Sequence, residues 1–398
     1  MPARPYTLTT RAIHPPEHAG RFSHQPTSAP IYPTSSFAYD RIEDAVRVFE
    51  GKETGYVYSR YANPTVVAAE AVVADLEGAE TAVAFGSGMA AILAGLLGVG
   101  VGAGRTVMAS RDLYGGTYAL LVNDLAGLGV ETVFVEADHL DQVEATLAKG
   151  AVAATYIETM SNPLLRVIDV PRIVELSHRY GARVVIDHTF ATPYLARPLE
   201  WGVDCVVHSG TKYLGGHGDI TCGVAVAPAF HDRVDKLRRN LGGVLSPFEA
   251  WLLLRGIKTF PLRMRQHCEN AMTVARFLEA HPKVTRVDYP GLSSHPDHDR
   301  AVRLFGGAGF GGVVAFDLGD GTMETAWRFI NGLRLCQAAT TLGDVETLVL
   351  HPATSSHRSL APEQRQRIGI GDGLVRMSIG IEGVEDILAD IEAALQTV

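Results

Sequence analysis

The sequence has few cysteines and no excess of positive charge. Only four of its 398 residues are cysteine, and none of them belongs to a C-x-x-C pair. Scattered thiols of this kind give no disulfide framework and are typical of the reducing cytoplasm, where we expect this protein to work. Lys and Arg number 35 against 44 Asp and Glu, which gives a formal net charge of −9. This balance argues against nucleic acid or a membrane surface as a partner.

The sequence also has no apolar leader and no internal repeat. Residues 1–20 lack the apolar core of a signal peptide. One uncharged stretch, residues 81–104, is long enough to span a bilayer, but a Gly-Ser-Gly triplet interrupts it. A strand, a tight turn and a buried helix over residues 89–97 therefore explain this stretch better than a membrane span does.

The chain is long enough for two domains and a separate N-terminal segment. Residues 1–62 are rich in Pro, Ser, Thr and Tyr, which predicts an extended arm with one helix that contacts a neighbouring subunit. Residues 63–256 alternate between β-branched runs and helix-like stretches such as 170–180, which indicates an α/β domain with a largely parallel sheet. Residues 257–398 predict a smaller α+β domain, reached through a long helix over residues 245–282. The predicted strands of the α/β domain are residues 82–85, 106–109, 130–135, 153–157, 183–186, 203–208 and 223–226.

Three motifs follow predicted strands of the α/β domain. The stretch "FGSGM" opens a helix, and the free backbone N–H groups there suit a phosphate. Asp187 ends the strand "ARVVID", where a carboxylate is costly unless a donor or a cation faces it. Lys212 follows the strand 203–208 among small residues. Taken alone, each motif also has a structural explanation: a glycine turn, a helix cap and a solvated loop lysine.

Ligands of doubly wound sheets bind beyond the carboxyl ends of the strands, so we expect the three motifs to meet at one site. Together they fit pyridoxal 5′-phosphate (PLP). A lysine amine forms a Schiff base with the PLP aldehyde, an aspartate keeps the pyridine nitrogen protonated, and a helix start holds the phosphate. A dehydrogenase-like binding module would leave Lys212 and Asp187 unexplained.

The sequence resembles the transsulfuration (cysteine/methionine metabolism) family of PLP-dependent enzymes. The stretches "HSGTKYLGGHGDITCGV" and "VVIDHTFATP" carry the resemblance, and "GYVYSRYANPT", "YGGT", "SNPLLRVIDV" and "GLVRMSIGIE" extend it over nearly the whole chain. It implies an α/β fold of the aspartate-aminotransferase type (fold type I), with a mostly parallel central sheet and a smaller α+β C-terminal domain. It also implies a homotetramer built as a dimer of dimers.

The resemblance implies roles for twelve residues. Lys212 would bind the cofactor covalently and shuttle protons, Asp187 would pair with the pyridine nitrogen, and Tyr114 would stack on the ring. The other expected cofactor contacts are Gly88, Met89, Ser209 and Thr211 at the phosphate, with Tyr58 and Arg60 reaching it from a neighbouring subunit. The expected substrate contacts are Asn162, Thr341 and Arg376, of which Arg376 would bind the α-carboxylate. No metal site is expected, because His351 and His357 are poorly spaced and lack a third ligand.

The resemblance implies removal or replacement of a γ-substituent of an amino acid. Gly116 stands where methionine γ-lyases usually carry cysteine, and Thr340 stands where cystathionine-handling members typically carry glutamate. His188 replaces the asparagine that is usual in the family. We expect it to contact only the residues that surround the site and not the ligand itself. Because "GGHGDIT" and "VLSP" look more like the lyase branch, we expect α,γ-elimination from methionine, homocysteine or cystathionine, giving α-ketobutyrate, ammonia and a thiol. The alternative is a γ-replacement enzyme, an O-acylhomoserine sulfhydrylase or a cystathionine γ-synthase.

Overall fold

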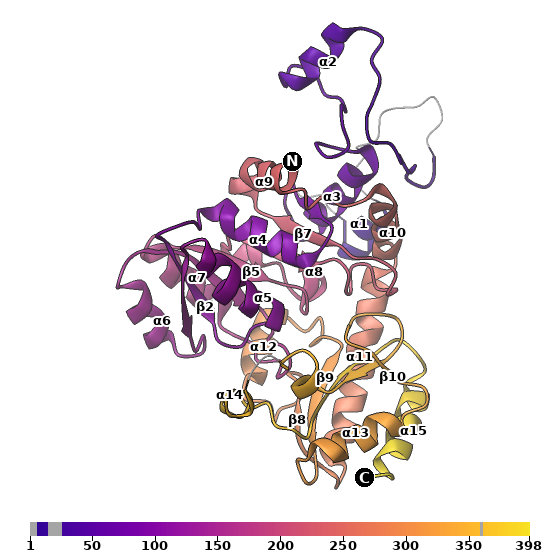
Figure 1. Cartoon of the computed structure of the whole chain (residues 1–398). Helices are drawn as coiled ribbons and strands as arrows, with labels where there is room; N and C mark the ends of the chain where they lie inside the picture. Colours follow the sequence, from indigo (N-terminus) through magenta and orange to yellow (C-terminus); the bar gives the residue numbers. More distant parts are fainter. Residues whose placement is uncertain (1–5, 15–25, 359–360) are drawn as a thin grey trace.

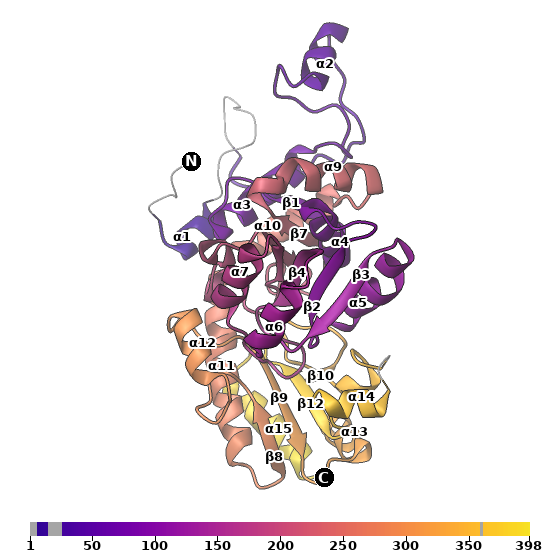
Figure 2. The same ribbon diagram turned by 90° about the vertical axis from the view of Figure 1, so that its left-hand side faces the viewer.

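A computed structural model describes residues 6–14, 26–358 and 361–398, which fold around two β-sheets (Figure 1, Figure 2). The larger sheet has the strand order β1-β7-β6-β5-β4-β2-β3, and only β7 runs antiparallel to its neighbours. All seven strands predicted for this sheet are confirmed. They are β1 (Val83–Phe85), β2 (Thr106–Ser110), β3 (Glu131–Val135), β4 (Val152–Glu158), β5 (Arg183–Asp187), β6 (Cys205–Ser209) and β7 (Gly223–Val226).

The strands of the larger sheet are apolar throughout because helices cover both faces. In β5, Val184 and Ile186 pack on the side of α3 (Pro64–Glu77) and α7 (Val170–Arg179). Val185 points the other way, toward α4 and α9. Successive side chains of a strand alternate between faces, so a strand buried on both sides needs a continuous apolar run.

The remaining helices of this part of the chain are α4 (Gly88–Val99), α5 (Gly115–Ala119), α6 (Leu140–Leu147), α8 (Thr192–Leu195), α9 (His231–Leu241) and α10 (Pro247–Ile257), with the short helical segments η1 (Leu120–Leu125), η2 (Pro198–Trp201) and η3 (Pro228–Phe230).

The uncharged stretch 81–104 forms β1, a tight turn and α4, as the sequence predicted. The helix α4 has 12 residues and lies against the larger sheet. Across the described ranges of the chain, no helix combines the length and the apolar character needed to cross a membrane.

The smaller sheet has the strand order β10-β11-β12-β9-β8. Three helices, α11, α13 and α15, pack on one of its faces, and its other face lies toward the larger sheet (Figure 1). This arrangement confirms the smaller α+β part that the sequence predicted at the C-terminal end. The elements are β8 (Val284–Asp288), β9 (Val313–Leu318), β10 (Gln337–Ala338), β11 (Leu348–Leu350), β12 (Leu374–Ser378), α11 (Phe260–Ala280), α12 (His298–Phe305), α13 (Met323–Gly332), α14 (Pro362–Arg367), α15 (Val384–Leu395) and the turn η4 (Pro352–Thr354).

The single long helix predicted over residues 245–282 is wrong, because this segment forms two helices, α10 and α11. The break falls at Lys258 and Thr259, just before Pro261 in the first turn of α11. Proline has no N–H to donate to the preceding turn, so a new helix starts there instead of the old one continuing. The two sheets use residues 83–226 and 284–378, and the domain bounds 1–62, 63–256 and 257–398 stay predictions.

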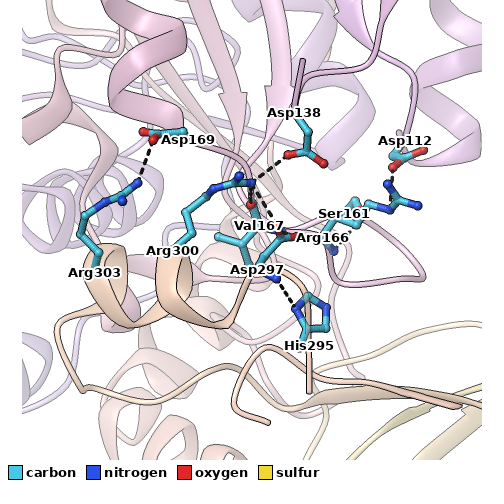
Figure 3. Close-up of polar contacts among 10 residues, drawn as sticks. All are labelled: Asp112, Asp138, Ser161, Arg166, Val167, Asp169, His295, Asp297, Arg300 and Arg303. Carbon is cyan, nitrogen blue, oxygen red and sulfur yellow. Dashed lines mark hydrogen bonds and ion pairs between the residues drawn. The ribbon is translucent and has the colours of Figure 1, made fainter. Parts of the chain in front are cut away.

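The helix α12 of the C-terminal part is held against loops that follow strands of the larger sheet (Figure 3). Arg300 Nη1 donates to Asp138 Oδ1 (2.8 Å), to the carbonyl oxygen of Val167 (2.6 Å) and to Asp297 Oδ1 (3.1 Å). Asp297 Oδ2 in turn accepts the N–H of Val167 (3.1 Å). The contacts with Val167 hold the segment between β4 and α7 against the C-terminal part of the chain.

We predict that Arg300→Met lowers the free energy of unfolding by about 2 kcal/mol, because three charged or carbonyl acceptors lose one donor whose side chain is only 27% exposed. Arg303→Met is the matched control. Arg303 makes a single ion pair with Asp169 (2.7 Å), and its side chain is 60% exposed, so its loss is expected to cost less than about 0.5 kcal/mol. Urea unfolding of both variants measures the difference. Equal midpoints would show that α12 is not held by Arg300.

Candidate functional site

A cavity of about 250 Å³ lies at the carboxyl ends of β4, β5 and β6, beside the start of α4. Residues of the C-terminal part, from the segment before β11 and from β12, close its other side. Ten of the twelve residues predicted from the sequence line it. They are Gly88, Met89, Tyr114, Asn162, Asp187, Ser209, Thr211, Lys212, Thr341 and Arg376.

One end of the cavity is the N-terminus of α4. The hydroxyl of Ser87 caps this helix by accepting the N–H of Ala90 (3.2 Å). A Cβ atom at Gly88 would lie 3.0 Å from the Cβ of Ser209, so glycine lets the helix start close to the end of β6. Backbone N–H groups at a helix start, next to a serine hydroxyl, form a cradle for a phosphate.

Thr211 lies in the cavity wall, and its hydroxyl already has two partners. It accepts the N–H of Cys222 (2.9 Å) and lies 3.2 Å from the carbonyl oxygen of the same residue. This pair ties the loop after β6 to the start of β7. The role of Thr211 at a phosphate stays a prediction.

Asp187 ends β5 with its carboxyl facing the cavity. Its Oδ1 accepts the N–H of Thr189 (2.9 Å), and within the described ranges no ion pair includes it. The surrounding protein raises the pKa of Asp187 by desolvation, which hydrogen bonds from Thr189 partly offset. A carboxylate in this setting suits a ligand that brings a positively charged N–H donor.

Lys212 Nζ donates a hydrogen bond to the hydroxyl of Thr341 (2.7 Å). Burial lowers the pKa of Lys212 to about 8, and the nearby positive charge of Arg376 acts in the same direction. An amine with this pKa is neutral in a substantial fraction of molecules near neutral pH. Lys212 is therefore able to act as a nucleophile and as a base.

Arg376 of β12 is 3% exposed and reaches the cavity from the smaller sheet. Its Nη1 donates to Asn162 Oδ1 (3.0 Å), and its Nη2 donates to the carbonyl oxygen of Thr341 (2.8 Å). Its Nε has no protein partner, and no carboxylate in the described part of the chain pairs with it. A buried guanidinium without a counter-charge suits an anionic substrate group.

Tyr114 lies just before α5 with its ring partly exposed at the cavity. A Cβ atom at Gly116 would come within 2.5 Å of Cε1 of this ring and 3.2 Å of the sulfur of Met89. A side chain at position 116 would displace the tyrosine ring, so the glycine allows the ring to keep its position.

Tyr58 and Arg60, the other two predicted residues, lie outside the cavity. Tyr58 is exposed, and the Arg60 guanidinium donates to the carbonyl oxygen of Arg239 (3.1 Å) and lies 4.9 Å from the ring centre of Tyr61. Their expected contact with another subunit's cofactor stays a prediction.

Glu158 also lines the cavity, and the sequence analysis missed it. It ends the buried strand "VAATYIE" in the way that Asp187 ends "ARVVID", so the same rule would have found it. Its Oε1 accepts the N–H of Tyr114 (2.7 Å). Burial, together with the neighbouring Asp187, raises the pKa of Glu158 well above its ordinary value.

The histidines singled out in the sequence make structural contacts. His188 is buried, with Nδ1 2.6 Å from the hydroxyl of Thr159 and Nε2 2.9 Å from the carbonyl oxygen of Ala196. Burial lowers the pKa of His188 to about 4, so the ring stays neutral. His351 Nε2 lies 2.7 Å from the carbonyl oxygen of Asp372. Over the described ranges, no group of three His, Cys, Asp or Glu side chains could hold a metal ion.

Comparison with known proteins gives consistent similarities over the full chain. Residues 9–396 match the family described as Cys/Met metabolism PLP-dependent enzyme. The chain is 42% identical over 404 residues to the L-methionine gamma-lyase of Fusobacterium nucleatum subsp. polymorphum, with 100% of both chains covered. It is 40% identical over 380 residues to the O-succinylhomoserine sulfhydrylase of Mycobacterium tuberculosis, covering 94% of this chain and 93% of that one.

A solved structure from Campylobacter jejuni is similar to this chain with a TM-score of 0.92 and 30% identity. The match covers 98% of this chain and 100% of that one. The Campylobacter jejuni protein contains N'-pyridoxyl-lysine-5'-monophosphate, a lysine bonded to the cofactor.

We predict that cofactor-free protein takes up PLP faster as the pH rises, with a midpoint near 8, because Lys212 must lose its proton to react. Arg376→Leu is expected to move this midpoint upward, since a positive charge that lowers the pKa of Lys212 is removed. Arg255→Leu, at an exposed position of α10, is the control and should leave the midpoint unchanged. Stopped-flow absorbance in the visible range follows the uptake. A pH-independent rate, or a visible band that persists in Lys212→Ala, would rule out Lys212 as the reacting group.

Proposed function

Because the chain belongs to the family of Cys/Met-metabolism PLP-dependent enzymes, we propose that it is a carbon–sulfur lyase that acts on a sulfur amino acid. Its reaction is an α,γ-elimination from methionine, homocysteine or cystathionine that yields α-ketobutyrate, ammonia and a thiol. The observation that carries the proposal is a single cavity that joins Lys212, Asp187 and Arg376. The relative with 42% identity over both full chains is an L-methionine gamma-lyase, which supports elimination.

The residues of the cavity fit the parts of PLP, the cofactor of this family. Asp187 would accept a hydrogen bond from the protonated pyridine nitrogen, because no ion pair in the described part of the chain occupies its carboxyl. The helix start at Gly88 and the hydroxyl of Ser209 bind the phosphate. Tyr114 stacks on the ring, and Lys212 holds the aldehyde carbon. PLP, when bound, supplies an electron sink for the negative charge that develops at the substrate Cα.

Arg376 orients the substrate by binding its α-carboxylate at two points with a planar guanidinium. Asn162 and Thr341 hold that guanidinium through the bonds of 3.0 and 2.8 Å. Lys212 is then the base. Its lowered pKa keeps part of the amine neutral, so that Nζ, once released from the cofactor, would take a proton from Cα of the substrate, give that proton up, and then take a proton from Cβ.

The cavity wall around Thr340 favours an uncharged substrate tail. In the described part of the chain, the carboxylates that line the cavity are Glu158 and Asp187, both at strand ends. The wall near Thr340 is formed by hydroxyl and apolar side chains, which include Thr341 and Leu342. The distal ammonium of cystathionine therefore has no acidic partner near Thr340, which supports methionine or homocysteine as the preferred substrate.

The second candidate is γ-replacement, in which a thiol or sulfide adds at the position that the leaving group vacates. The similarity to an O-succinylhomoserine sulfhydrylase at 40% identity favours this candidate. The same residues bind the cofactor and the α-carboxylate in both reactions, so the two candidates differ only in the fate of the γ-carbon.

We further propose a cytoplasmic homotetramer, a dimer of dimers, in which the arm of one subunit lies on its neighbour. The helix α2 (Ile42–Phe49) projects away from the rest of the chain, with Ile42 75% and Phe49 65% exposed (Figure 1). An isolated helix of eight residues is marginal in water, so a covering partner surface is needed. Tyr58 and Arg60 follow this helix in the sequence, and in this assembly they would reach a neighbour's phosphate. The four cysteines are free and buried, which supports a reducing compartment.

Product analysis distinguishes the two candidate reactions. The purified protein, loaded with PLP, is incubated with methionine, homocysteine or cystathionine, and separately with O-acetylhomoserine plus sulfide. We predict α-ketobutyrate from methionine or homocysteine at a higher kcat/KM than from cystathionine. Rapid sulfide-dependent formation of homocysteine without α-ketobutyrate would overturn the lyase assignment. Lys212→Ala is the control and should give neither product.

A further inference from the structure

Two loops meet at the cavity, and one side chain contacts both. The first loop follows β2 and carries Tyr114, and the second follows β4 and carries Asn162. Glu158 is the last residue of β4 and the register partner of Asp187 on the neighbouring parallel strand β5. Both side chains therefore point to the same face of the sheet, the face covered by α4, from strands roughly 5 Å apart.

The carboxyl of Glu158 is tied to backbone donors and not to a cation. Its Oε1 accepts the N–H of Tyr114 (2.7 Å), and the nearby backbone N–H of Asn162 acts to lower the pKa of this carboxyl. The side chain is 6% exposed, and none of the ion pairs in the described ranges includes it. A buried carboxyl at the start of the loop after β4 that accepts an N–H from the loop after β2 fixes the distance between those loops.

A second link joins the same two loops farther from the cavity (Figure 3). Arg166 Nε lies 3.4 Å from Asp112 Oδ2, and the N–H of Arg166 donates to the hydroxyl of Ser161 (3.2 Å). The Arg166 side chain is substantially exposed, so this outer pair is weak. The inner link through Glu158 therefore sets the relative position of the two loops at the cavity.

We propose that Glu158 is a positioning residue, whose carboxyl sets the place of the Tyr114 ring and of the Asn162 amide relative to Asp187. The proposal rests on the cofactor site of the proposed function, but it does not depend on which sulfur amino acid reacts or on the fate of the γ-carbon.

A displacement at Glu158 would reach the other functional groups through hydrogen bonds. Asn162 accepts from Arg376 (3.0 Å), Arg376 donates to the carbonyl oxygen of Thr341 (2.8 Å), and the hydroxyl of Thr341 accepts from Lys212 (2.7 Å). Burial and the charge of Asp187 raise the pKa of Glu158, which favours its neutral form. A neutral carboxyl beside Asp187 does not compete with it for a cation.

The test compares three substitutions of Glu158. Glu158→Ala removes the acceptor of the Tyr114 N–H and leaves that group without a partner, so we expect kcat/KM to fall about 10²-fold. Glu158→Gln keeps a carbonyl oxygen at the same reach and should stay within about 10-fold of the unmodified protein. Glu158→Asp keeps the carboxyl but retracts it by one methylene, so it is expected to behave like alanine. An active Asp variant with an inactive Gln variant would overturn the proposal, and this comparison stands even where Glu158→Ala fails to fold.

A double-mutant cycle separates positioning from general stability. In a Tyr114→Ala background the ring is absent, so adding Glu158→Ala should cost less than about 10-fold in kcat/KM. An equal loss in both backgrounds would contradict a role through Tyr114. Asp390→Ala is the matched control, since Asp390 accepts the N–H groups of Arg334, Leu335 and Cys336 (2.8, 2.9 and 2.9 Å) away from the cavity. It should lower stability but leave kcat/KM and the visible band of the PLP-loaded protein unchanged.

The visible band distinguishes this proposal from the proposed function. If the unmodified protein shows no visible band with PLP, the cofactor site itself is wrong. If it shows the band and turns over substrate, but Glu158→Ala and Asp390→Ala lose the same activity, only the role of Glu158 is wrong. Turnover is measured with whichever substrate the unmodified protein prefers.

Discussion

The carboxyl of Asp187 and the cationic side chains of Lys212 and Arg376 share the central cavity without pairing with one another. Asp187 receives only a backbone N–H and a neighbouring hydroxyl, Lys212 bonds a threonine hydroxyl, and Arg376 bonds an amide and a carbonyl oxygen. Withdrawing ionised groups from water costs several kcal/mol each unless a counter-charge replaces the lost hydration. A ligand that brings a cation to Asp187 and an anion to Arg376 supplies both counter-charges, as PLP and an amino acid together do.

The cavity exists only where the two parts of the chain meet. Asp187 is the last residue of β5 in the larger sheet and Lys212 lies in the turn after β6, whereas Arg376 comes from β12 of the smaller sheet. The contacts of Arg300 with Val167 and Asp138 hold the segment after β4, which carries Asn162, against the C-terminal part. Rigidity at this distant contact therefore supports the geometry around Arg376.

Local signals in the sequence allowed the fold class, the helix start at Gly88, Asp187 and Lys212 to be predicted, whereas the other cavity residues were predicted only from the resemblance to the family. Continuous apolar runs mark the strands of a sheet covered on both faces, and a polar residue at the end of such a run, such as Asp187, marks the cavity. The break at Thr259 was missed although Pro261 signals it. Glu158 was missed although it ends the buried run of β4 in the same way that Asp187 ends β5. The bond between Arg376 and Asn162 joins residues 214 positions apart, a pairing that one sequence does not reveal.

The free energy of unfolding of Asp187→Asn, measured with and without PLP, tests most directly whether the cavity holds charges that gain their counter-charges only from a bound ligand. Asparagine keeps the oxygen that accepts the N–H of Thr189 but removes the charge. We predict that the cofactor-free variant is at least as stable as the cofactor-free unmodified protein, and that PLP stabilises the variant far less. A cofactor-free variant that is less stable, and that PLP stabilises as strongly as the unmodified protein, would contradict this account.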